Sequence, residues 1–216
     1  PAPSLENFME IVCLDLEGVL VPEIWISVAE TTGIDALRAT TRDNPNYDDL
    51  MQQRLSIMDE HGLGLSTIQN AIGGLSPLNG ATEFLAWLNT EFQVVILSDT
   101  FYEFARPLMS KLNWPTLFCN RLEINEQGRI INYYLRMKDH KRQAVRAFKS
   151  LNFNVFAVGD SYNDTAMLSA ADTGYLFRAP RNVTKEFSQF PNVQEFGELK
   201  QSLTDGSPRL RKMSNG

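Results

Sequence analysis

Near its amino terminus the chain reads Ile11-Val12-Cys13-Leu14-Asp15-Leu16-Glu17-Gly18-Val19, an apolar run that ends at two acids and a glycine. The run at residues 11–14 is too short for a helix and stops at turn-forming residues, which favours a buried β-strand. Similar apolar runs occupy residues 94–97, 155–158 and 175–177. We therefore expect four strands, the first three of which end at a cluster of Asp, Ser or Gly.

Helical patterns alternate with these strands. Residues 81–88 form one such pattern, and residues 143–151 another, with Ala144, Phe148 and Leu151 on its apolar face. Strands that alternate with helices predict a doubly wound α/β fold, in which a parallel sheet carries helices on both faces. In such sheets the chemistry gathers at the carboxyl ends of the strands, which is where the acidic clusters of this chain fall.

Two segments interrupt the alternation. Residues 23–79 contain no strand-like run but three helix-like stretches, at residues 24–32, 48–61 and 66–73. Residues 121–135 contain two β-prone runs around a polar turn that ends in glycine, which predicts a hairpin. The expected division is a catalytic core at residues 9–22 and 80–205, a small helical cap at residues 23–79, and flexible termini at residues 1–8 and 206–216.

Composition narrows the classes of function. The 216 residues, 43% of them hydrophobic, suffice for one sizeable core with a smaller insertion. The formal net charge of −6 argues against a nucleic-acid partner, because an acidic surface repels phosphates. The two cysteines, Cys13 and Cys119, show no disulfide or zinc pattern, and no apolar stretch is long enough to span a bilayer. We expect a cytoplasmic protein without a membrane partner.

Acids follow two of the predicted strands. Asp15 and Glu17, two residues apart around a tight turn, suit a nucleophile and a general acid/base aimed at one phosphorus atom, although a solvated turn has the same composition. Asp160 and Asp164 flank the start of a helix after residues 155–158. Their carboxylate oxygens are ligands for a hard cation, and Mg²⁺ prefers one or two carboxylates together with water and phosphate oxygens.

Two further segments add a hydroxyl and a lysine. The hydroxyl of Ser98, in Ser98-Asp99-Thr100, can hold a phosphoryl oxygen, whereas the alternative is that Ser98 or Asp99 caps the following helix. Lys141 lies in a basic stretch, residues 138–142, and can neutralise phosphoryl charge if it reaches the site. A solvated charge run is the alternative, and we expect the neighbouring His140 to be a bystander.

Together and in this order, the four clusters resemble the four motifs of the haloacid dehalogenase superfamily, over roughly residues 9–203. The motifs read here Asp15-Leu16-Glu17-Gly18-Val19, Ser98, Lys141 and Gly159-Asp160-Ser161-Tyr162-Asn163-Asp164. The chain is most similar to the phosphoserine phosphatase branch and, within it, to the bacterial phosphoserine:homoserine phosphotransferases. Glu17, where Asp is usual, and Ser98-Asp99-Thr100, where Ser-Gly-Gly is usual, fit that subgroup.

The resemblance implies a double displacement through an aspartyl phosphate on Asp15. It makes Glu17 the acid for the departing serine oxygen and then the base for the incoming water or alcohol. It places Mg²⁺ between the Asp15 carboxylate, the Glu17 backbone carbonyl and Asp160, which a phosphate needs because the carboxylates alone repel it. Ser98 and Lys141 would hold the phosphoryl oxygens.

The resemblance also assigns second-sphere and substrate contacts. Asp164 would order metal-bound water or Lys141. Glu23 would face the ammonium of phosphoserine and Arg54 its carboxylate, with Asn163 and the Ser98-Asp99 turn as further contacts. A surface charge is the alternative for Arg54.

The predicted function is the hydrolysis of O-phospho-L-serine, with transfer of the phosphoryl group to homoserine as a further expectation. Two alternatives remain: a related phosphatase for a sugar phosphate or phosphoglycolate, and a receiver-type phosphoacceptor signalling module. The predicted cap argues against the receiver module, because receivers carry none. The oligomeric state is left open, with a homodimer among the alternatives.

Overall fold

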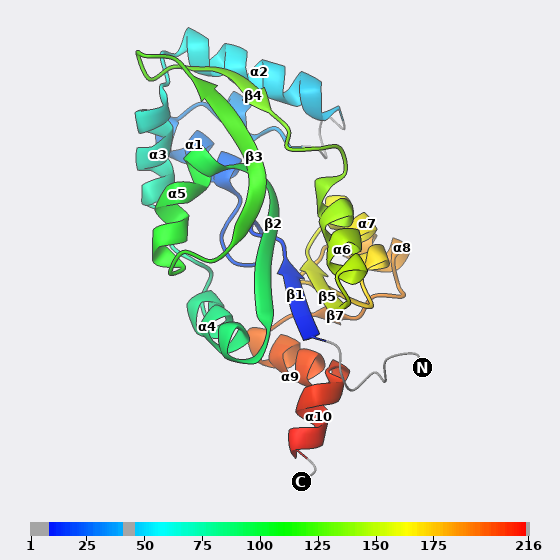
Figure 1. Ribbon diagram of the computed structural model, residues 1–216. Coiled ribbons are helices and arrows are strands. Elements are labelled where there is room, and N and C mark those ends of the chain that lie inside the picture. The colour runs from blue at the N-terminus through cyan, green and yellow to red at the C-terminus, as the bar shows by residue number, and fades with distance from the viewer. Residues whose placement is uncertain (1–8, 41–45, 215–216) are drawn as a thin grey trace.

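The computed structural model describes residues 9–40 and 46–214 and contains a mostly parallel sheet in the order β4-β3-β2-β1-β5-β6-β7 (Figure 1). Its strands are Met9–Leu14 (β1), Gln93–Phe101 (β2), Leu117–Ile124 (β3), Ile130–Tyr134 (β4), Phe153–Gly159 (β5), Thr173–Phe177 (β6) and Asn192–Val193 (β7). Only β4 runs antiparallel to its neighbour among these strands. The four predicted strands and the doubly wound α/β fold are confirmed.

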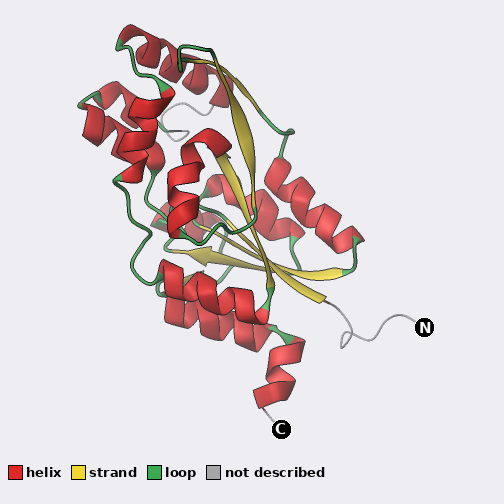
Figure 2. Ribbon diagram, turned by 60° about the vertical axis from the view of Figure 1, so that its left-hand side comes forward, coloured by secondary structure: helices red, strands yellow, loops and turns green. Residues whose placement is uncertain are grey.

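The helices cover both faces of the sheet (Figure 2). They are Ile24–Thr32 (α1), Tyr47–Glu60 (α2), Leu65–Gly73 (α3), Ala81–Glu91 (α4), Tyr102–Lys111 (α5), His140–Ser150 (α6), Thr165–Ala170 (α7), Arg181–Glu186 (α8), Phe196–Gly206 (α9) and Pro208–Ser214 (α10), with short 3₁₀-helices at Asp35–Arg38 (η2) and Tyr162–Asp164 (η3). None of the described helices combines the length and apolar character that a membrane crossing requires.

Alternate side chains of β1 belong to two separate apolar clusters, one on each face. Val12 and Leu14 join the cluster that includes α4, α5 and α9, whereas Ile11 and Cys13 join the cluster with α6, α7 and α8. This period of two is the property of a strand buried on both faces. Cys13 is therefore a buried, unpaired thiol, as is Cys119.

The topology changes direction at β1. The chain adds β2, β3 and β4 on one side of β1 and then returns to place β5 on its other side. A parallel sheet opens a crevice at the carboxyl ends of the strands beside such a switch point. The loops after β1 and β5 and the end of β2 therefore face the same crevice.

The three helices expected within residues 23–79 are present as α1, α2 and α3, and the expected hairpin is β3–β4. The hairpin extends from the sheet to lie beside α2 (Figure 1), where Arg129 pairs with Asp59 and the Tyr133 hydroxyl bonds the carboxylate of Asp48. One buried apolar cluster contains side chains of both α1–α3 and the sheet. The division into core and cap stays a prediction.

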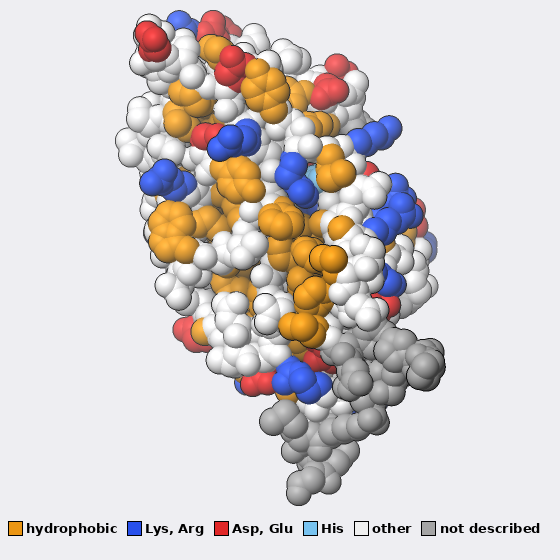
Figure 3. All heavy atoms as spheres, viewed as in Figure 1, with side chains coloured by type: hydrophobic (Ala, Val, Ile, Leu, Met, Phe, Trp, Pro, Cys, Tyr) orange, Lys and Arg blue, Asp and Glu red, His pale blue; other side chains and the backbone are white. Residues whose placement is uncertain are grey.

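Hydrophobic side chains gather on the face of the molecule where β3 and β4 lie (Figure 3). Ile131 and Tyr134 of β4 are about half exposed, at 51% and 54%, and β4 is the edge of the sheet. A homodimer stays a prediction.

The carboxyl-terminal segment after Gly206 contains a further helix, while its expected flexibility stays a prediction. Residues 208–214 form α10, which follows the fully buried Ser207. The Ser207 hydroxyl bonds both carboxylate oxygens of Glu10, at 2.9 and 2.8 Å, and accepts the backbone N–H of Leu210 at 3.0 Å. The polar and basic sequence of this segment gives no local sign of the buried contact, because Glu10 lies 197 residues away. The expectations for residues 1–8 and 215–216 lie outside the described residues.

We predict that Ser207→Ala lowers the free energy of unfolding by about 1–3 kcal/mol, because the buried Glu10 carboxylate loses a hydrogen-bond donor. Urea unfolding of the two proteins measures the difference. Ser188→Ala is the matched control, since Ser188 is exposed, and its stability should be unchanged. Equal stabilities of the two variants would refute the structural role of Ser207.

Candidate active site

The loop after β1 holds Asp15 in a fixed position. The Asp15 N–H donates to the Val158 carbonyl of β5 at 2.9 Å, which continues the pairing of the two strands by one residue. Its Oδ1 accepts the N–H of Leu16 at 2.8 Å, and the residue is 5% exposed. Asp15 thus stands at the carboxyl end of the central strand, as the sequence predicted.

The loop after β5 is built around Asp164. Asp164 Oδ2 accepts the N–H groups of Asp160 and Ser161 at 3.0 and 3.3 Å, as part of a capping box at the start of η3. Asp164 is fully buried, and a Cβ on Gly159 would lie 2.3 Å from its Cβ. Residue 159 must therefore be glycine for this loop to close.

Three carboxylates converge in the crevice. One oxygen from each of Asp15, Asp160 and Asp164 lies within 4.8 Å of the others. Burial and then the charge of Asp164 raise the pKa of Asp15 well above its ordinary value and that of Asp160 to about 7. This concentration of uncompensated negative charge and oxygen ligands fits a hard divalent cation such as Mg²⁺.

Gly18 makes room for this cluster. Its φ is +75°, and a Cβ there would lie 2.3 Å from Oδ2 of Asp160. The glycine of the first motif is thus required twice, by the left-handed backbone and by the carboxylate that approaches it.

Lys141 binds the acids from the first turn of α6. Its Nζ lies 2.9 Å from Asp15 Oδ1, 2.8 Å from Asp164 Oδ1 and 3.2 Å from Asp99 Oδ2, and the residue is 4% exposed. Burial disfavours its charge, but Asp15 and Asp164 raise its pKa well above the ordinary value. The alternative of a solvated charge run is wrong for Lys141, which is a buried cation in the crevice.

The apolar face of α6 agrees with the prediction in part. Ala144 is buried and Phe148 packs against the same apolar cluster, whereas Leu151, also expected on this face, follows the last residue of the helix and is 67% exposed. His140 and Lys141 extend the buried face at the amino end of the helix, where they contact the acids.

Ser98 and Asp99 lie within β2 rather than in a turn after it. Strand β2 continues to Phe101 with an irregular register, α5 begins at Tyr102, and neither Ser98 nor Asp99 caps the helix. The cap alternative is therefore wrong. Ser98 is 1% exposed, and its Oγ accepts the N–H of Thr100 at 3.2 Å.

The Asp99 carboxylate links three side chains of the site. His140 Nε2 lies 2.9 Å from its Oδ1, and Asn163 Nδ2 donates to its Oδ2 at 2.9 Å, beside the contact with Lys141. Burial alone would raise the pKa of Asp99, but Lys141 and His140 hold it well below its ordinary value. Asp99 and Asn163 thus bond each other, and His140 has a defined contact that its isolated position in the sequence did not indicate.

Glu17 and Glu23 lie at the start of α1. Glu17 Oε2 accepts the N–H of Ile24 at 2.8 Å. Burial and then the charge of Glu23 raise the pKa of Glu17 to about 8, so its carboxyl group is mostly protonated at neutral pH. Glu23 is exposed and makes no capping bond to the helix.

Arg54, from α2, is buried rather than a surface charge. It is 5% exposed, its guanidinium lies 4.3 Å from the ring centre of Trp25, and Nη2 donates to the Ala39 carbonyl at 2.8 Å. Its Nε is buried without a hydrogen-bond partner, and no carboxylate pairs with it among the described residues. Burial lowers the pKa of Arg54 to about 10, against the opposing effects of Tyr47, Glu17 and Glu23.

Tyr47 was not singled out from the sequence. Its hydroxyl donates to the Asp99 carbonyl at 3.3 Å and so connects α2 with the irregular part of β2. A lone tyrosine at a helix start carries no sequence signal for this contact.

These acids and the lysine at the strand ends define a hydrolase of the haloacid dehalogenase type. A family model described as haloacid dehalogenase-like hydrolase matches residues 9–172, and the chain belongs to this family. The family resemblance predicted from the motifs is thereby confirmed, and it favours an enzyme over the receiver module.

Two relatives and two solved structures are similar to the chain. It is 63% identical over 201 residues to the phosphoserine phosphatase ThrH of Pseudomonas aeruginosa (93% of this chain, 98% of that protein), and 62% identical over 204 residues to a phosphoserine phosphatase of Pseudomonas syringae pv. tomato (94% and 86%). A phosphoserine phosphatase in apo form has a TM-score of 0.70 at 20% identity (87% of this chain, 94% of that one). A phospho-aspartyl intermediate analogue of phosphoserine phosphatase has a TM-score of 0.72 at 20% identity (88% and 95%). At this identity the structures show the shared fold.

We predict that Gly18→Ala weakens divalent-cation binding by about tenfold or more, because the added methyl group displaces the Asp160 carboxylate. Titration of the metal-free protein with Mg²⁺, followed by activity and by calorimetry, measures the loss. Gly33→Ala is the matched control, since Gly33 has the same left-handed backbone (φ +71°) but open space around it. If both variants bind Mg²⁺ equally, backbone strain alone explains the effect and the steric argument fails.

Proposed function

We propose that the chain is a phosphoserine phosphatase, which converts O-phospho-L-serine and water into L-serine and phosphate. The observation that supports the chemistry best is the contact of Asp15 with the buried Lys141 beside Asp160 and Asp164. Asp15 is the nucleophile: its free oxygen attacks phosphorus, the bond from phosphorus to the serine oxygen breaks, and an aspartyl phosphate forms on the chain.

Glu17 moves the protons in both steps. With a pKa of about 8 it is protonated at neutral pH and gives its proton to the departing serine oxygen. It then takes a proton from the water that attacks the phosphoaspartate, which releases phosphate and regenerates Asp15. Transfer to homoserine, in which an alcohol replaces this water, stays a prediction from the resemblance.

The cation is proposed to be Mg²⁺, held by Asp15, Asp160 and the backbone carbonyl of Glu17, where it would offset charge on the phosphoryl oxygens. Lys141 and Ser98 are proposed to hold the remaining phosphoryl oxygens. Because Lys141 is anchored by Asp164 and Asp99, it keeps its place when Asp15 is phosphorylated.

Arg54 and Glu23 select the substrate in this proposal. Arg54 is a buried guanidinium with an unpartnered Nε, which a substrate carboxylate can satisfy with a charge-assisted bond. Glu23 is exposed and lies close enough to Glu17, Arg54 and Asp160 to influence their pKa values, so it can meet an ammonium group beside them. The helical cap, residues 23–79, carries both residues. A cytoplasmic location stays a prediction.

We predict that Asp15→Asn lowers kcat by more than about a thousandfold while the thermal unfolding transition is retained, because the amide is not a nucleophile. Glu17→Gln, given an aryl phosphate whose leaving group needs no proton, should accumulate a phosphoenzyme visible as a phosphate adduct in the intact mass. Asp15 is excluded as nucleophile if Asp15→Asn retains activity within about tenfold of the wild type.

We predict that Arg54→Gln raises KM for phosphoserine by about a hundredfold, since a charge-assisted bond to the substrate carboxylate is lost. O-Phosphoethanolamine, which has the ammonium and phosphate but no carboxylate, should be hydrolysed with the same kcat/KM by the variant and the wild type. Equal losses of kcat/KM for both substrates would mean that Arg54 stabilises the fold and does not bind the substrate carboxylate. That result would favour another phosphomonoester as the substrate.

A further inference from the structure

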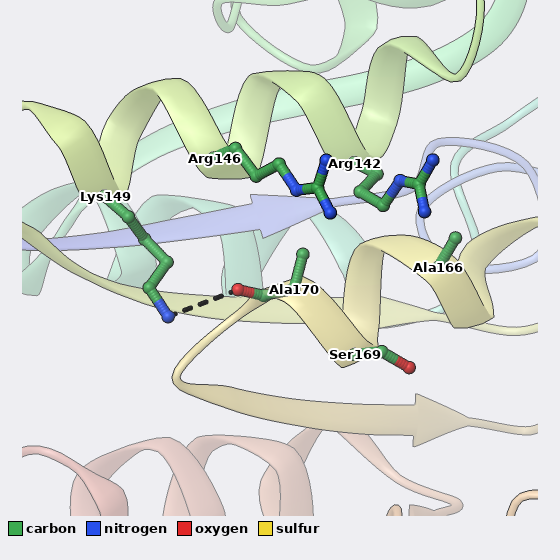
Figure 4. Close-up of a pocket in the computed structure, with 6 residues that line it drawn as sticks. All are labelled: Arg142, Arg146, Lys149, Ala166, Ser169 and Ala170. Carbon is green, nitrogen blue, oxygen red and sulfur yellow. Dashed lines mark hydrogen bonds between the residues drawn. The ribbon is translucent and has the colours of Figure 1, made fainter.

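A groove of about 500 Å³ lies between α6 and α7, outside the crevice described above. Its lining residues are Arg142, Arg146 and Lys149 from α6 and Ala166, Ser169 and Ala170 from α7. Figure 4 shows the two arginine side chains directed toward the space over α7, where the short side chains of Ala166 and Ala170 leave room. No acid is among the lining residues.

The positive charge of this groove is only partly balanced. Lys149 lies 2.8 Å from Asp172 and donates a hydrogen bond to the Ala170 carbonyl, so Asp172 balances its positive charge. Arg142 pairs with Asp139, but its Nε is buried without a hydrogen-bond partner. Arg146 has no ion pair or hydrogen bond to any described residue. Within the described part of the chain, the groove therefore holds one unpaired positive charge, on Arg146, and one unused hydrogen-bond donor, the Nε of Arg142.

Two like charges four residues apart on a helix repel each other weakly, and an anion that contacts both would offset this repulsion. The helical rise places their Cα atoms about 6 Å apart along the axis, so both guanidinium groups can reach one tetrahedral anion. Guanidinium groups bind phosphate oxygens with paired N–H donors. We propose that the groove binds a single phosphate group through Arg142 and Arg146, either free or carried by a small molecule.

A longer polyanion fits less well. The three basic residues of α6 that line the groove span only about 10 Å along the helix, and the chain carries a net charge of −6 that repels an extended polyanion. The balance of charges therefore selects a small ligand. This site is separate from the proposed reaction, because neither arginine belongs to the group of residues around Asp15.

The test uses the metal-free, ¹⁵N-labelled full chain at low ionic strength, titrated with inorganic phosphate. Without a cation, the carboxylates of Asp15, Asp160 and Asp164 disfavour phosphate in the crevice, so binding there does not mask the groove. We expect saturable shifts of the amide signals of Arg146, Ser169 and Ala170. Arg146→Gln should weaken binding by about tenfold, while Arg106→Gln, which removes an exposed arginine from α5, should leave it unchanged.

A second titration with a phosphomonoester identifies the source of the phosphate group. Saturable shifts of the same amides would show that the groove takes phosphate on a small molecule, and shifts with inorganic phosphate alone would restrict it to the free ion. The proposal is overturned if neither ligand shifts these amides saturably, or if Arg146→Gln and Arg106→Gln bind equally. No turnover is measured, so failure of the proposed phosphatase activity does not affect the result.

Discussion

Lys141 is the residue on which the arrangement of the site depends. Three carboxylates within 4.8 Å of one another repel strongly in a buried crevice, and Lys141 contacts Asp15 and Asp164 at 2.9 and 2.8 Å. One cation cannot balance three anions. Burial and the negative charge that remains near Asp164 therefore raise the pKa values of Asp15 and Asp160. The excess negative charge of the site therefore favours a divalent cation, and a bound cation would in turn attract a phosphate group.

The sheet brings these groups together while β1 and β5 keep regular parallel pairing. β1 and β5 are adjacent and in register, so the residue after each strand faces the same crevice. The close approach has two strict requirements, which are the glycines at positions 18 and 159, because a Cβ at either position would collide with Asp160 or Asp164. The motif residues that carry no charge are thus as specific to this geometry as the acids.

How much could be predicted from the sequence follows from the range of each interaction. The strands and the placement of Asp15 and Asp160 at their ends depend on local patterns, and these were predicted. The apolar face of α6 was predicted at Ala144 and Phe148 but not at Leu151. The burial of Lys141 and His140 on this helix was missed, because their partners Asp15 and Asp99 lie 126 and 41 residues away in the chain. The same holds for Ser207 and Glu10, which lie 197 residues apart.

The role of Asp99 shows this limit most clearly. A Ser-Asp-Thr sequence after an apolar run is typical of a helix cap, and that local interpretation was wrong. Three partners from distant segments, His140, Lys141 and Asn163, hold the carboxylate instead. These contacts fix the positions of Lys141 and Asn163 relative to Asp99, and a contact of Asp99 with the substrate stays a prediction.

In the proposed function, Arg54 connects this electrostatic centre with the choice of substrate. Burial lowers its pKa to about 10, because the charged guanidinium loses its hydration. Stacking on Trp25 and one backbone carbonyl do not remove that cost, because neither supplies a full negative charge. A ligand carboxylate would supply it. The hydrogen bond from Tyr47 to the Asp99 carbonyl holds α2, which carries Arg54, beside the acids. With Arg54 in the proposed role, a substrate with phosphate at one end and carboxylate at the other would gain from both halves of the site, whereas a sugar phosphate would gain from one.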